Sequence, residues 1–149
     1  MRGLSKKRSG PAVFQRHLKL ETQGHRDLHD LSEPVLRVVE QSGIRTGVVH
    51  IFVVGSTAAV GTIEFEPGLQ EDLPALLDRL IPPSDEYGHE RACHDGNAHS
   101  HLQSTLMGAS LCVPVDAGGL VLGNWQQIVF LECDTRPRER TIVVTVTGA

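Results

Sequence analysis

Aromatic residues, cysteines and long apolar runs are all scarce in this 149-residue chain, and each scarcity excludes a class of protein. Its three cysteines, an odd number without CxxC spacing, exclude a disulfide scaffold and favour a reducing compartment. Aromatic residues make up 4% of the chain and its net charge is -4, whereas a general nucleic-acid binder needs stacking rings and a basic face. The longest apolar run is too short to cross a bilayer. We therefore expect a cytoplasmic protein with neither nucleic acid nor membrane as a partner.

One domain accounts for the chain after its first residues. Residues 1–11 are basic and are not followed by the apolar stretch of a signal peptide, so we expect a flexible tail there. Residues 12–149 contain no internal repeat or linker, and a chain of this length buries roughly two thirds of its unfolded surface. We expect a single domain over residues 12–149.

Apolar spacing predicts the secondary structure. A helix is expected to begin at Ser32 as N-cap and to stop at Gly43. A second helix, over residues 69–80, carries a leucine stripe that we expect to face the core. Strands are expected over residues 12–21, 48–54, 62–66, 110–115, 120–124, 126–133 and 141–147. These elements predict an α+β fold, a mainly antiparallel sheet or sandwich with two helices packed on it.

Four further expectations are local, three about exposure and one about an irregular segment. The almost continuous apolar run over residues 48–54 predicts a strand covered on both faces. Glu64 and Glu66 are expected on one strand face, either solvated or available for acid–base work or cation binding. Trp125, the only tryptophan, is expected as a core residue or a subunit-interface anchor; the alternative is that its ring stacks on a ligand. Residues 82–98 show no periodicity and predict a long irregular loop, which in compact domains is usually functional or disordered.

Four of the eight histidines fall within residues 89–101, which makes this segment the first candidate site. In an extended backbone, His99 and His101 would present both imidazoles on one face, where one ion could bridge them. A third ligand from His89, His94 or Asp95 would give the open three-ligand set of a catalytic metal. The alternative is that these histidines hydrogen-bond polar neighbours and that residues 95–97 form a simple turn.

Other polar residues suggest an anion site. Arg136, Arg138 and Arg140 alternate around a proline and could clamp a phosphate or carboxylate; alternatively, they form a charged strand entrance that pairs with Asp134 and Glu139. The step over residues 55–57 lacks a GxSxG elbow and a Walker A pattern, so its hydroxyls are expected to position a ligand or cap a turn.

Several of these motifs, in their order along the chain, resemble the YjbQ family. They are Ser56-Thr57-Ala58-Ala59-Val60, the Asp-Gly-Asn-Ala-His-Ser-His run over residues 95–101, residues 110–115, and residues 122–128 followed by Arg136-Pro137-Arg138. The resemblance implies a small α+β protein, typically trimeric, and some members are described as secondary thiamine-phosphate synthases. It also implies a polar cluster that corresponds here to Thr57, Glu64, His89, Asp95, Asn97, His99, His101, Gln126 and Arg136.

The resemblance and the residues together give one hypothesis and one alternative. We expect a homotrimeric enzyme that acts on a small phosphorylated or anionic substrate with a divalent metal, zinc or magnesium, and thiamine-phosphate synthesis, a transferase reaction that releases pyrophosphate, is the named candidate. The alternative is a non-enzymatic trimer that binds a small ligand or metal in the same pocket. The expected catalytic residues are Glu64, His89, Asp95, His99 and His101, the metal ligands His89, His99 and His101, and the substrate-binding residues Ser56, Thr57, Asn97, Gln126, Arg136 and Arg138.

Overall fold

The computed structural model describes residues 10–149, so most of the tail expected over residues 1–11 lies outside the described residues. The described chain is a mixed α+β domain with antiparallel sheets, as predicted. Its elements, in chain order, are β1 (Ala12–Glu21), β2 (Leu28–Asp30), α1 (Ser32–Ser42), β3 (Gly47–Val54), β4 (Ala58–Ile63), α2 (Pro67–Leu80), α3 (Gly88–Cys93), α4 (Ala98–Met107), β5 (Ser110–Asp116), β6 (Gly119–Leu120), β7 (Gln127–Glu132) and β8 (Glu139–Gly148).

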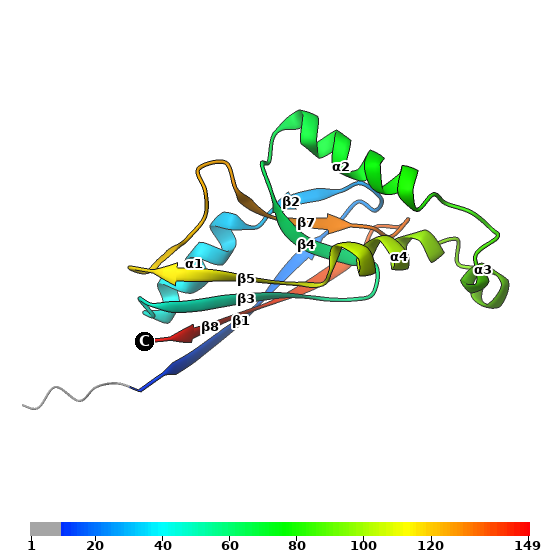
Figure 1. The fold of residues 1–149 in the computed structure, drawn as a ribbon. Helices are drawn as coiled ribbons and strands as arrows, with labels where there is room; N and C mark the ends of the chain where they lie inside the picture. Colours follow the sequence, from blue (N-terminus) through cyan, green and yellow to red (C-terminus); the bar gives the residue numbers. More distant parts are fainter. Residues whose placement is uncertain (1–9) are drawn as a thin grey trace, which may run out of the picture.

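Two antiparallel sheets form the framework. The larger has the strand order β1-β8-β3-β5-β6, so β8 lies between β1 and β3, and the smaller has the order β2-β7-β4. The main core lies between the two sheets and includes α1, because Val35, Val38 and Val39 of α1 are buried there with strand residues such as Val144 and Phe130. A smaller core lies on the other side of β4 and β7, where α2 and α4 pack. Figure 1 shows α2 on the side of the smaller sheet that faces away from the larger one.

Local sequence explains why α1 forms, although its cap differs from the prediction. The helix ends at Gly43, whose φ of 68° is the left-handed conformation that glycine adopts most easily. The predicted N-cap, Ser32, is instead the first helical residue, and its hydroxyl accepts the backbone N–H of Ile128 on β7 over 2.9 Å. The serine therefore fastens the helix to the sheet.

The pairing of Glu64 and Glu66 on one strand face is wrong, because β4 ends at Ile63. Glu66 is the N-cap of α2, and its carboxylate accepts the backbone N–H groups of Gly68 and Leu69. The helix consequently begins at Pro67, two residues earlier than predicted. Glu64 is exposed at the end of the strand.

The predicted leucine stripe of α2 is only partly in the core. Leu77 is buried, but Leu76 and Leu80 are 43% and 60% exposed. Leu102 and Leu106 of α4 are exposed as well. The outer surface of the helices therefore carries apolar side chains that no described residue covers.

The prediction that β3 is covered on both faces is also wrong. Val49, Ile51 and Val53 face the main core, whereas Phe52 and Val54 on the other face are 42% and 49% exposed. Helix packing accounts for the inner face only, because α1 and the smaller sheet lie on that side. Among residues 10–149, the outer face of the larger sheet carries no such layer.

Residues 82–98 are less irregular than predicted, since α3 forms over Gly88–Cys93 and α4 begins at Ala98. The strand expected over residues 120–124 is reduced to the short β6, and Trp125 follows it with 73% of its surface exposed, so its interpretation as a core residue is wrong. None of the helices in residues 10–149 has the length and apolar character that crossing a membrane requires.

Candidate functional site

Three strand connections and two helix ends meet at one end of the molecule. They are residues 22–27 between β1 and β2, residues 55–57 between β3 and β4, residues 133–138 between β7 and β8, the end of α2 and the start of α4. Figure 1 shows these connections at the end of the sheets where α4 begins. Backbone contacts join them: Cys133 N donates to Thr57 O over 3.0 Å, and Thr22 N donates to Arg138 O over 2.8 Å. The β1–β2 and β7–β8 connections approach each other so closely at Gly24 that an added Cβ there would lie 3.0 Å from the carbonyl carbon of Arg136.

Asp78, near the end of α2, gathers three side chains at this end of the molecule. His25 and Arg26 both donate to its Oδ2 atom, over 3.0 and 2.7 Å. Gln103 on α4 donates to Oδ1 over 3.1 Å. Burial raises the pKa of the Asp78 carboxyl, but the three hydrogen bonds outweigh burial and lower the pKa to about 2. Asp78 is therefore a carboxylate at neutral pH.

His99 lies beside His25 in the same cluster. Their ring centroids are 5.9 Å apart in an edge-to-face arrangement, and His99 is 3% exposed. Burial, and next the neighbouring His25, lower the pKa of His99 below its ordinary value. His25 Nδ1 is fully covered and has no hydrogen-bond partner among residues 10–149. The cluster therefore contains a neutral imidazole and an unpartnered ring nitrogen close together.

A buried arginine–carboxylate network borders this histidine cluster. Arg140 Nε donates to Glu132 Oε2 over 2.8 Å, and Arg140 Nη2 donates to Glu132 Oε1 and, over 2.9 Å, to the hydroxyl of Thr57. The Thr57 hydroxyl in turn donates to Asp134 over 3.0 Å, and Arg138 donates to the same carboxylate over 2.7 Å. Thr57, predicted as a substrate-binding residue, is thus the hydroxyl that links the two ion pairs.

The three arginines differ in their surroundings. Arg140 is buried, the side chain of Arg138 is 40% exposed, and Arg136 is exposed. The interpretation that this run forms a charged strand entrance is confirmed for Asp134, which pairs with Arg138. Glu139 pairs instead with Lys19 on the neighbouring strand, over 3.3 Å. The run therefore serves structural ion pairs and also leaves Arg136 available to solvent.

Asp134 remains ionised in this network. Burial raises the pKa of its carboxyl, but the backbone N–H of Thr135, the Thr57 hydroxyl and the Arg138 guanidinium together lower the pKa below its ordinary value. Each of its oxygens is therefore occupied by donors from the protein.

His99 and His101 lie in the helix α4 and not in the extended backbone that the sequence analysis considered, so their side chains are separated. Because successive residues of an α-helix are rotated by about 100°, His99 and His101 project on nearly opposite sides of the helix, about 160° apart. His101 lies instead near His89, with ring centroids 4.8 Å apart, and His89 Nε2 lies 3.3 Å from Asn97 Oδ1. In the described part of the chain, no three or more His, Cys, Asp or Glu side chains are grouped so that they could hold a metal ion. The predicted ligand set of His89, His99 and His101 does not fit one ion.

The start of α4 is held by Glu90, a residue that the sequence interpretation missed. The Glu90 carboxylate accepts the N–H of Gly96 over 2.7 Å and that of Ala98 over 2.6 Å. These hydrogen bonds, above all the one from Ala98, lower the pKa of Glu90. The segment around Asp95, which is exposed, is therefore a helix-capping turn, as one of the two alternatives proposed.

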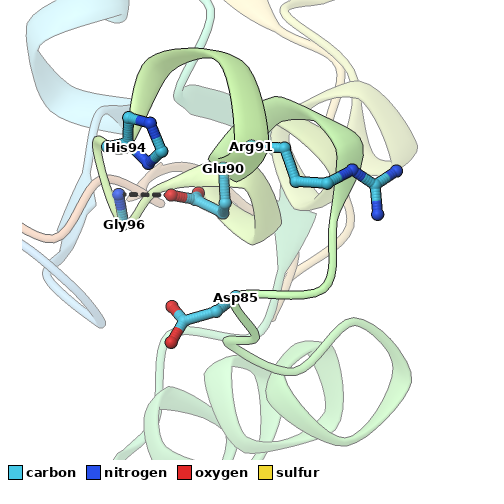
Figure 2. A pocket seen from close by; sticks show the side chains of 5 residues that line it. All are labelled: Asp85, Glu90, Arg91, His94 and Gly96. Carbon is cyan, nitrogen blue, oxygen red and sulfur yellow. Dashed lines mark hydrogen bonds between the residues drawn. The ribbon is translucent and has the colours of Figure 1, made fainter.

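Glu90 also lines a surface pocket of about 440 Å³ together with Asp85, Arg91, His94 and Gly96. Figure 2 shows the Glu90 carboxylate directed at Gly96, while the Arg91 side chain extends away from the others. The carboxylate is occupied by backbone donors, and the arginine does not face it. The pocket therefore lacks a converging set of free polar groups.

Two predicted site residues lie elsewhere. Glu64 follows the end of β4, and Gln126 precedes β7, at the pairing of Ile63 with Gln127. Because a strand rises by about 3.3 Å per residue, this end of β4 is about 20 Å from Thr57. Gln126 donates to Thr62 over 3.1 Å, and Ser56 is exposed in the β3–β4 connection. One chain therefore does not gather all the predicted residues into one pocket.

The fold and the site define a small α+β protein whose sheets end in a cluster of buried histidine, arginine and carboxylate side chains. The chain belongs to the YjbQ family: the family model described as "UPF0047 protein YjbQ-like" matches residues 16–149. A UPF0047 protein of Methanothermobacter thermautotrophicus is 40% identical over 136 residues, which cover 91% of this chain and 93% of the relative. A UPF0047 protein of Archaeoglobus fulgidus is 40% identical over 127 residues, 85% of this chain and 96% of the relative. The family resemblance seen in the sequence is confirmed.

Solved structures of similar proteins support the same family and fold. The crystal structure of a YbjQ-like protein of unknown function from Sulfolobus solfataricus superposes with a TM-score of 0.89 at 37% identity, covering 94% of this chain and 100% of that one. An uncharacterised YjbQ/UPF0047 protein from Clostridium acetobutylicum gives a TM-score of 0.81 at 31% identity, with 88% and 98% covered. The family is thus one of unknown function, and its fold is shared along nearly the whole chain.

Proposed function

We propose that this protein is a cytoplasmic enzyme that acts on a small phosphorylated or otherwise anionic substrate by proton transfer at the His25–His99 cluster. The observation that carries the proposal is the 3.0 Å contact between His25 Nε2 and Asp78, which leaves Nδ1 of the same ring unpartnered. A carboxylate that accepts the Nε2–H holds the tautomer in which Nδ1 is a proton acceptor.

His25 and His99 differ in burial, and we assign them different roles for that reason. The His25 side chain is 27% exposed, so a substrate can lie against its ring, but its Nδ1 is covered and can exchange a proton only with a group inside the cluster, whereas His99 is buried. The lowered pKa of His99 keeps this imidazole neutral at neutral pH, so that it can exchange a proton with a neighbouring group. The exposed guanidinium of Arg136 and the partly exposed one of Arg138 supply positive charge for an anionic substrate group.

A turnover assay with matched histidine variants tests this proposal. The first reaction to try is the release of pyrophosphate from a pyrimidine pyrophosphate and a thiazole phosphate, followed by a panel of phosphomonoesters. We expect His25→Gln and His99→Gln each to lower the rate by about a hundredfold, the usual size of an acid–base contribution. His17→Gln, at an exposed position of β1, is the matched control and should leave the rate unchanged.

Two results would count against the proposal. If pyrophosphate release by the wild type does not exceed that of Arg136→Ala, thiamine-phosphate synthesis should be dropped for this chain. If the wild type binds phosphate compounds without converting any of them, the non-enzymatic alternative is the better description.

The divalent metal stays a prediction, and no step of the proposed chemistry passes through it. Of the three expected ligands, only His89 and His101 lie close together. Calorimetric titration with Zn²⁺ should therefore respond to His89→Ala and His101→Ala but not to His99→Ala. Equal zinc binding by the wild type and all three variants would remove the metal from the proposal.

We also propose that the protein is a homotrimer whose copies meet at the open face of the larger sheet. On that face, Val48, Phe52 and Val54 are 45%, 42% and 49% exposed in one strand, and apolar side chains exposed together can mark a protein–protein contact. A second apolar surface on α2 and α4 includes Leu80 and Leu106. Two different apolar surfaces on one chain suit the head-to-tail contacts of a closed ring.

A further inference from the structure

Arg140 is almost completely buried, yet one of its nitrogens has no partner. Its side chain is 8% exposed. The Nε and Nη2 atoms donate to Glu132, and Nη2 also donates to Thr57, but Nη1 makes no hydrogen bond to any residue between 10 and 149. A guanidinium group carries five N–H donors, so two of them remain available at Nη1.

Gly55 lies next to Arg140 Nη1, and because glycine has no side chain it leaves this nitrogen uncovered. A Cβ built at Gly55 would lie 2.8 Å from Arg140 Nη1, closer than such atoms can approach. Gly55 and the adjacent Ser56 are exposed. In the described part of the chain, the fully covered side-chain polar atoms without a partner are His25 Nδ1 and Ser100 Oγ, so Nη1 keeps contact with solvent. The missing side chain leaves a gap through which Nη1 is reached.

The position of Nη1 in the gap is fixed by the rest of the guanidinium. Two nitrogens of the planar group are held by Glu132, whose carboxylate also accepts the Thr22 hydroxyl over 2.8 Å and the backbone N–H of Asp134 over 2.9 Å. An incoming anion therefore pays little ordering cost at this donor. The nearby carboxylates are each paired with an arginine, which limits their repulsion of an anion.

We propose that the Gly55 gap is an anion subsite in which Arg140 Nη1 donates to an oxygen of a phosphoryl group and the exposed Ser56 hydroxyl donates to another. The identification of that group as part of a substrate rests on the proposed function. The binding of the anion itself does not. The subsite lies beside Thr57, whose hydroxyl already contacts Arg140, and so adjoins the polar network at the end of the sheets.

Calorimetric titration with inorganic phosphate, using two glycine variants, tests the subsite. Gly55→Ala places a methyl group over Nη1 and leaves the ion pair with Glu132 in place. Gly108→Ala is the matched control, because Gly108 also has a positive φ, 100° against 149° at Gly55, and nothing lies within 4 Å of its added Cβ. We expect Gly55→Ala to weaken phosphate binding at least tenfold, as the loss of one hydrogen bond to a charged group does, and Gly108→Ala to leave binding within twofold.

A measurement on the wild type covers the case in which Gly55→Ala fails to fold. Phosphate should shift the guanidinium NMR signals of Arg140, assigned by their absence in Arg140→Lys. Unshifted signals, or equal phosphate affinity of folded Gly55→Ala and Gly108→Ala, would overturn the subsite. Phosphate binding that depends on Gly55 in a protein without turnover would support the subsite and contradict the proposed enzyme, so the two failures can be told apart.

Discussion

His25 Nε2 and Asp78 Oδ2 lie 3.0 Å apart, although 53 positions separate the two residues in the chain. The contact joins the β1–β2 connection to the end of α2, and Gln103 extends it to α4. Three segments that are distant in the sequence are thus held together by one carboxylate.

Replacement of that carboxylate should change the acid stability of the protein. The pKa of Asp78 is lowered from 3.8 to about 2 in the folded state, so its contribution to stability is complete above 3.8 and is lost as the pH falls toward 2. We expect Asp78→Asn to lower the free energy of unfolding at pH 7 and to flatten its pH dependence in that window. Urea unfolding at several pH values measures both effects. Asp72→Asn, at an exposed position of α2, should leave the curve unchanged.

Protonation of His99 should also destabilise the fold, at a higher pH. Its pKa is lowered from 6.5 by burial, so the unfolded chain takes up the proton first. The stability contribution of the neutral ring is complete above 6.5 and declines as the pH falls below that value. We expect His99→Gln to remove this part of the pH dependence and His17→Gln to retain it, as measured by thermal unfolding between pH 5 and pH 8. A wild-type stability that does not change over this interval would contradict the assignment.

The two ion pairs of the arginine network should differ sharply in their effect on stability. Arg140→Ala leaves Glu132 buried without its charge partner and should cost about 3 to 5 kcal/mol. Arg138→Ala removes a guanidinium that is 40% exposed and should cost roughly 1 kcal/mol. Chemical denaturation of the two variants makes the comparison. A double variant, Arg140→Met with Glu132→Leu, should lose less unfolding free energy than Arg140→Ala, because it leaves no unpaired buried charge at this ion pair.

The proposed trimer predicts a change of mass with a single substitution. Phe52→Glu places a carboxylate in the exposed apolar patch of β3 and should yield monomers, whereas Gln41→Glu on the exposed side of α1 should not. Sedimentation velocity at micromolar concentration distinguishes the two states. A wild type that sediments as a monomer would overturn the trimer.

The sequence predicted those features that depend on neighbouring residues. The helix α1 was identified correctly, because Pro34 and Gly43 act locally at its start and end. The conformation around His99 was not predicted correctly. Its helix, α4, is capped by the carboxylate of Glu90, nine positions before His99, and no pattern within the histidine run indicates that hydrogen bond. An extended backbone was a reasonable but wrong alternative.

The site depends on contacts that no local pattern contains. His25 lies in an unremarkable polar turn, and its role is visible only once Asp78 is brought to it by the packing of α2. Alternation grouped Arg136, Arg138 and Arg140 together, but only Arg140 lies in a strand, β8. The alternation could not show that Arg140 alone is buried, because that burial requires β8 to lie between two other strands.

The strand β8 follows the other described strands in the chain and yet lies inside the larger sheet, where it pairs with β1 on one side and β3 on the other. Neither neighbour can complete its hydrogen bonds before β8 is present. During synthesis, β1 and β3 must therefore wait with unpaired edges, and the sheet can close only after residues 139–148 have left the ribosome. Such long-range pairing favours slow folding and exposes the nascent chain to aggregation, so the order of the strands makes the folding of this domain depend on the emergence of β8.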